Sequence, residues 1–167
     1  MKITFGFSKN TSCQPFSVAI RLVEKRDYSH VYMKIVDETT NEVMIYQASH
    51  GFVNIVPLER FLEHSIICEE YELEVDDTKY IQVKKEMNSY LGLSYGFAQI
   101  LNIFVQKLFQ SKNIKLVENG KKQFICSELG YIILKILFPE IIADEDSVTP
   151  SDFNVLIKKC LLKGKNV

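Results

Sequence analysis

One cysteine stands where a helix is expected to begin. Cys126 lies in "QFICSELGYIILKIL" (residues 123–137), between a short apolar run and a segment with helical character. A thiol in a first helical turn lies near unpaired backbone N–H groups and the positive end of the helix dipole, which both favour the thiolate. Cys126 is therefore a candidate nucleophile. The alternative is a small buried apolar residue at the start of a core helix.

A thiol nucleophile needs a base, and the chain has three histidines. His30 begins the segment "HVYMKIV", in which Val31, Met33 and Ile35 share one strand face and His30 points to the other. His50 precedes a glycine, as turn residues do, and His64 ends "LERFLEH", where a cation suits a helix C-terminus. His30 is thus the candidate base, with an ordinary surface histidine as the alternative.

The third candidate follows from the register of a predicted hairpin. If four residues form the loop between Asp37 and Glu42, Tyr32 faces Gln47, and His30 lies diagonally from Gln47 on the same face. A slip of one residue would separate them. In this register the Gln47 amide could orient the imidazole, although it cannot supply the charge of a carboxylate. The alternative for Gln47 is a solvated strand position.

Hydrophobic periodicity predicts the elements that must position these residues. Alternation and turn residues predict strands over 2–8, 29–37, 42–49, 51–56 and 69–75, and the last four are expected to form an antiparallel meander. Helices are predicted over 14–26, 57–64, 78–91, 97–109, 126–137 and 149–162. The fold class is α+β, with an antiparallel meander or small barrel packed against helices.

Composition bounds the function. With 167 residues and 47% hydrophobic content, the chain is expected to form a single domain over 1–167. Its 20 basic and 21 acidic residues are interspersed, which disfavours a nucleic-acid partner. No segment reaches the roughly 20 apolar residues of a membrane span, and no signal peptide is recognised, so we expect a cytoplasmic protein. The four scattered cysteines predict neither disulfides nor a metal site, and no cofactor is expected.

The order of four short motifs resembles the permuted papain-like cysteine hydrolases, relatives of the NlpC-type cell-wall peptidases. The motifs are "AIRLVEKRDYSHVYMKI", "VMIYQASHGFVNIVPLERF", "FICSELGYIILK" and "VTPSDFNVL", and the resemblance runs from about residue 17 to residue 155. It implies a circularly permuted papain-like fold in which His30, Gln47 and Cys126 are catalytic. The chain departs from the pattern in having Gln47 where many relatives have Glu, and "VDETTNE" where many have a glycine-rich segment.

The resemblance implies an amidase or peptidase that forms an acyl-enzyme on Cys126 and acts on a peptide-type amide. Tyr28, Tyr32 and Tyr95 are candidates to line the cleft, with core packing as the alternative. Two other functions stay open: a thioesterase or acyltransferase acting on lipid acyl groups, and a binding module that has lost turnover. Relatives are often exported, but no signal peptide is recognised here. A cell-wall substrate would therefore be met after release on lysis or from a phage particle. Neither the substrate nor the oligomeric state follows from the sequence.

Overall fold

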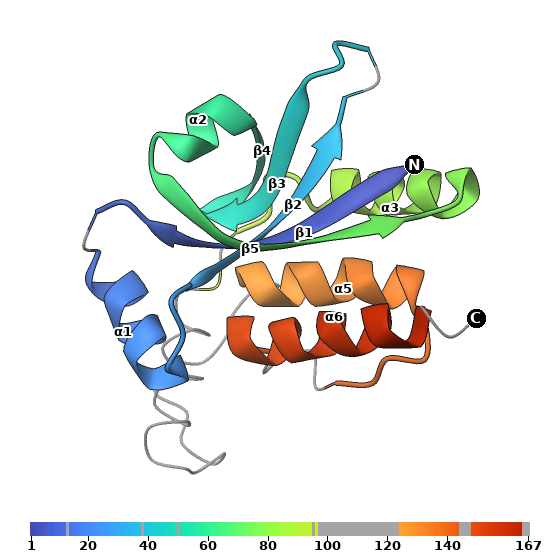
Figure 1. Cartoon of the computed structure of the whole chain (residues 1–167). Helices are drawn as coiled ribbons and strands as arrows, with labels where there is room; N and C mark the ends of the chain where they lie inside the picture. Colours follow the sequence, from blue (N-terminus) through green and yellow to red (C-terminus); the bar gives the residue numbers. More distant parts are fainter. Residues whose placement is uncertain are drawn as a thin grey trace.

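The computed structural model describes residues 1–12, 14–37, 39–49, 51–94, 96, 124–143 and 148–164. A twisted antiparallel sheet separates helices α5 and α6, which lie below it in Figure 1, from the short helix α2, which lies above it. The architecture is α+β, as the periodicity predicts. Within the described residues, no helix combines the length and the apolar character needed to cross a membrane.

The sheet has five strands in the order β4-β3-β2-β1-β5. Their bounds are β1 Lys2–Asn10, β2 His30–Val36, β3 Val43–Ser49, β4 Phe52–Pro57 and β5 Ser65–Glu74. The sheet is open, with β4 and β5 at its edges, so it does not close into a barrel.

The predicted position of the last strand is wrong. Strands β1 to β4 lie side by side in sequence order, but β5 pairs with β1 instead of continuing the meander beside β4. The reason is α2 (Leu58–Leu62), which contacts β3, β4 and β5 and carries the chain across one face of the sheet to its other edge. As a result β1 becomes a central strand, and six of its nine residues are buried.

The remaining described helices are α1 Pro15–Glu24, α3 Asp77–Tyr90, α5 Cys126–Leu137 and α6 Pro150–Gly164. Helix α6 begins with a cap: the Thr149 hydroxyl donates to Asp152 Oδ2 (2.7 Å), and Asp152 N–H donates to the Thr149 hydroxyl (3.3 Å). The predicted helix over 97–109 lies outside the described residues.

The main core lies between the sheet and helices α3, α5 and α6. Val31 and Met33 face this core, as the alternation of β2 predicts. Gly130 brings α5 unusually close to β2, because a Cβ there would lie 3.1 Å from Val31 Cγ1 and 3.0 Å from Phe153 Cζ. Close packing at Gly130 therefore holds α5 between β2 and α6.

Candidate active site

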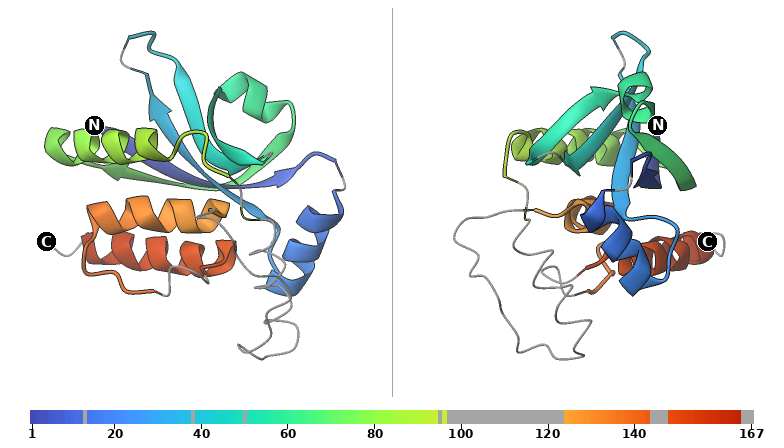
Figure 2. Two further views of the ribbon diagram at one scale, coloured as in Figure 1. Left: turned by 180° about the vertical axis from the view of Figure 1, so that it is seen from behind. Right: turned by 90° about the vertical axis from the view of Figure 1, so that its left-hand side faces the viewer.

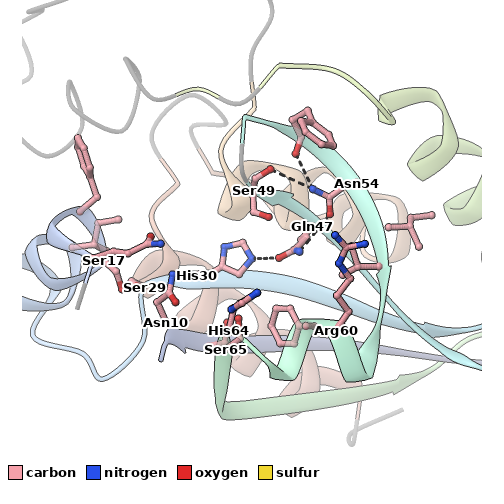
Figure 3. Close-up of a pocket in the computed structure, with 18 residues that line it drawn as sticks. Asn10, Ser17, Ser29, His30, Gln47, Ser49, Asn54, Arg60, His64 and Ser65 are labelled. Carbon is pink, nitrogen blue, oxygen red and sulfur yellow. Dashed lines mark hydrogen bonds between the residues drawn. The ribbon is translucent and has the colours of Figure 1, made fainter. Parts of the chain in front are cut away.

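A groove of about 580 Å³ opens on the α2 face of the sheet. Its walls come from α1, the end of β1, the start of β2, strands β3 and β4, and α2. His30 and Gln47 both line it, and Figure 3 shows the imidazole pointing toward the Gln47 side chain. The groove is a candidate active site because a histidine and several polar side chains line it together.

The hairpin register brings His30 and Gln47 together. Met33 pairs with Tyr46 and Val36 with Val43, and the Asp37 N–H donates to Glu42 O (2.8 Å), which closes the expected four-residue loop. Extending this register places Gln47 diagonally from His30 on the same face. His30 Nε2 lies 2.8 Å from Gln47 Oε1 (Figure 3). The register prediction is confirmed.

The tautomer of His30 follows from the chemistry of its partner. An amide oxygen can only accept a hydrogen bond, so Nε2 carries the proton and donates it to Gln47 Oε1. The lone pair then lies on Nδ1, which is the nitrogen able to accept a proton. Gln47 is buried, with 7% of its surface exposed, so the alternative of a solvated strand residue does not hold.

A second amide holds the first in place. Gln47 Nε2 donates to Asn54 Oδ1 (3.4 Å), and Asn54 Nδ2 donates to the carbonyl oxygens of Ser49 (3.3 Å) and Phe52 (3.4 Å). Because those carbonyls can only accept, they fix the direction of both amides and leave Gln47 Oε1 aimed at His30. We did not predict Asn54. The signal was available, since a two-residue turn before Phe52 places Asn54 opposite Gln47.

Cys126 occupies the first position of α5, as predicted. Within the same turn, Glu128 caps the helix by accepting the Ile125 N–H at Oε2 (3.1 Å). The Glu128 side chain is buried, and its negative charge offsets part of the helix dipole at the thiol. The start of α5 therefore favours a thiolate at Cys126 less than an uncapped helix would.

The segment before Cys126 runs along the end of the sheet at which His30 lies. Phe124 N–H donates to Ser94 O (3.2 Å), Ser94 bridges to Phe52, and Phe52 pairs with Ser49 at the end of β3. Figures 1 and 2 show α5 beginning under the end of the sheet where β2 starts. Cys126 itself is 5% exposed, belongs to the core on the α5 side, and is not among the residues that line the groove.

The tyrosine predictions need correction. Tyr28 packs in the helix-side core with its ring 4.8 Å from that of Phe7, and burial raises its pKa to about 12. Tyr32 packs on Phe61 (4.7 Å between ring centroids), and its hydroxyl donates to Glu70 Oε1 (2.8 Å). Burial, and then this hydrogen bond, raise the pKa of Tyr32. Neither side chain lines the groove, because each ring is used for packing.

Other expected residues fall elsewhere. Tyr95 and His50 lie outside the described residues. His64 follows α2 rather than ending it, and its exposed side chain lines the groove. Its Nε2 lies 3.9 Å from Glu63 Oε2. Arg60, which the sequence did not single out, also lines the groove from α2. In the part of the chain that the structure describes, no group of three or more His, Cys, Asp or Glu side chains could hold a metal ion.

Comparison with known proteins yields a structural neighbour. No family model and no curated protein matches the sequence. The crystal structure of metalloprotein yiiX from Escherichia coli O157:H7, a DUF1105 protein, aligns with a TM-score of 0.54 and 18% sequence identity, covering 86% of this chain and 68% of that one. At this identity the similarity concerns the fold.

Proposed function

We propose that the protein is a cysteine hydrolase of the permuted papain-like type, which cleaves an amide bond through an acyl-enzyme on Cys126. The observation that carries the proposal is the hydrogen bond of 2.8 Å between His30 Nε2 and the buried Gln47 Oε1, which puts the ring proton on Nε2 and the basic lone pair on Nδ1. Together with a cysteine at the first turn of α5, it supplies a base with its orienting partner and a candidate nucleophile.

In the proposed reaction, His30 Nδ1 takes the proton from Cys126 Sγ, and the thiolate attacks the carbonyl carbon of the substrate. Backbone N–H groups at the start of α5 stabilise the oxyanion of the tetrahedral intermediate. The imidazolium then protonates the leaving amine as the C–N bond breaks. His30 next removes a proton from water, the resulting hydroxide attacks the thioester, and the acid is released as the thiol is restored.

Gln47 is a positioning residue in this scheme. It holds the imidazole in one tautomer and one orientation, and Asn54 holds Gln47 in turn. Because the amide is neutral, it stabilises the imidazolium less than a carboxylate would. The reaction is therefore expected to proceed with a weaker orienting group than in relatives that carry Glu.

A second candidate is cleavage of a thioester or transfer of an acyl chain. Phe16 on α1 and Phe52 on β4 line the groove with 55% and 47% of their surfaces exposed, and apolar walls of this kind suit an acyl group. A panel of matched amide and thioester substrates, which differ only in the bond to be cleaved, would separate the two reactions.

The role of Gln47 can be tested without a known substrate by following alkylation of Cys126 with iodoacetamide at pH 6. Gln47→Ala should lower the second-order rate constant about 10- to 100-fold, because the unheld imidazole no longer shares the thiol proton. Gln47→Glu should keep or raise the rate and should raise the pKa of His30 above its wild-type value in an NMR titration, since a carboxylate favours the imidazolium.

His50→Ala is the matched control, because it removes the other histidine considered for this role and leaves the His30–Gln47 pair intact. The rate should then change little. If His50→Ala abolished alkylation while Gln47→Ala left it intact, the third position of the triad would pass to His50.

A further inference from the structure

The described part of the groove carries an unbalanced charge. Arg60 is its permanently charged lining residue, His30 and His64 are the titratable ones, and no Asp or Glu is among the described lining residues. This differs from the protein as a whole, in which acidic and basic residues nearly balance at a net charge of −1. A ligand that fills the groove would therefore meet a positive wall.

Packing holds the backbone of Arg60 at that wall. The next residue, Phe61, is 4% exposed and packs on Tyr32 in a small core that also includes Ile45. Helix α2 is thus pinned to the sheet, while the Arg60 side chain is exposed and lines the groove (Figure 3). Among the described residues no carboxylate pairs with Arg60, and the Glu63 carboxylate contacts His64 instead.

We propose that the substrate carries an anionic group, a carboxylate or a phosphate, that Arg60 binds on the α2 side of the scissile bond. This inference rests on the proposed function of the groove and specifies the substrate class. A bound substrate removes water from the guanidinium, and the cost of that desolvation is offset when the substrate supplies a counter-charge. The planar fork of an arginine matches carboxylate and phosphate oxygens with paired hydrogen bonds.

The anionic group should lie several bonds from the reacting carbonyl. Phe61 packs over Tyr32, which is two residues or about 7 Å along β2 from His30. Arg60 precedes Phe61, so its backbone lies beside this part of β2, and we place the anionic group of the substrate there. A dipeptide-sized spacing between the scissile carbonyl and the charge fits this arrangement.

The test uses alkylating probes that differ only in charge. Iodoacetyl-Gly-Ala with a free carboxylate is compared with its C-terminal amide, and iodoacetyl-phosphoethanolamine with iodoacetyl-ethanolamine, by the apparent second-order rate constant for modification of Cys126. In the wild type, at least one anionic probe should react about fivefold faster than its neutral partner, as a partly desolvated ion pair allows. Whichever pair shows the larger ratio identifies the carboxylate or the phosphate as the preferred group.

Substitutions assign the preference to Arg60. Arg60→Gln should bring the ratio of anionic to neutral rates close to one, and Arg60→Lys should restore part of it. Lys85→Gln is the matched control, because it removes the same charge from an exposed position on α3 and should leave the ratio unchanged. Equal rates for both probe pairs in the wild type, or a preference that survives unchanged in Arg60→Gln, would overturn the proposal.

A measurement independent of the thiol keeps this inference separate from the proposed function. Cys126→Ala is titrated with acetyl-Gly-Ala, with its C-terminal amide and with acetyl-phosphoethanolamine, while the imidazole signals of His30 and His64 are followed by NMR. An anionic ligand should bind more tightly than the amide, and Arg60→Gln should remove the difference. If Cys126→Ala binds the anionic ligands no more tightly than the amide, the role of Arg60 is overturned. If Cys126 in the wild type does not react with neutral iodoacetamide, only its role as the nucleophile is overturned.

Discussion

Replacing His30 with alanine is expected to slow the alkylation of Cys126 by iodoacetamide at pH 6 about 30- to 100-fold. When the His30 imidazole is present, Cys126 can exist as a thiolate paired with an imidazolium. This pair can form at a pH well below the usual pKa of a thiol, which is about 8.5. Without the imidazole, the start of α5 still favours the thiolate, but the buried Glu128 carboxylate in the same turn opposes it. The rate constant is measured by mass spectrometry of the peptide that contains Cys126.

His64→Ala provides the control for this prediction. His64 lines the same groove, but its side chain is 69% exposed and its Nε2 lies 3.9 Å from Glu63 Oε2. Its removal should leave the alkylation rate of Cys126 within about twofold of the wild type. A wild-type rate in His30→Ala would mean that the imidazole does not share the thiol proton.

Gly6→Ala is expected to lower the free energy of unfolding by about 2–3 kcal/mol. A Cβ at position 6 would lie 2.1 Å from Tyr32 Cζ and 2.4 Å from its hydroxyl oxygen, so the ring would have to move. Tyr32 is 1% exposed, packs on Phe61 and donates a hydrogen bond to Glu70, which leaves it little room. Urea denaturation measures the loss, and the displaced ring should also loosen α2.

A double-mutant cycle shows whether the Tyr32 ring causes the loss. In a Tyr32→Leu background the ring is absent, so adding Gly6→Ala should cost much less than it does in the wild type. An equal cost in both backgrounds would place the strain elsewhere. If Gly6→Ala had the same midpoint of urea unfolding as the wild type, the result would contradict the close packing of β1 against Tyr32.

Local patterns in the sequence were sufficient to predict the start of α5, the helix that includes α6 and the β2–β3 hairpin. Each depends on residues close together in the chain: the turn-forming residues between Asp37 and Glu42 fix the register, and the register fixes the faces of His30 and Gln47. The hydrogen bond between those two side chains is a consequence of this local order.

Features that depend on distant segments could not be predicted in the same way. The alternation of β2 assigns Tyr32 to the face opposite Val31, but whether that face is buried depends on α2, which follows two strands later. The same helix sends β5 to the β1 edge and places Arg60 over the groove. Asn54 is different, because its position opposite Gln47 follows from the local turn between Ser49 and Phe52.

The pH dependence of iodoacetamide labelling in the native protein tests the central claim most directly. Cys68 and Cys160 serve as internal references: burial, and then the charge of Asp27, raise the pKa of Cys68, and Cys160 is buried in α6. We predict that Cys126 reacts rapidly between about pH 5.5 and 6.5, well below the range in which a free thiol ionises, while both reference thiols stay unmodified. A Cys126 rate that rises only near pH 8.5, or labelling of Cys126 only after unfolding, would contradict an activated nucleophile paired with His30.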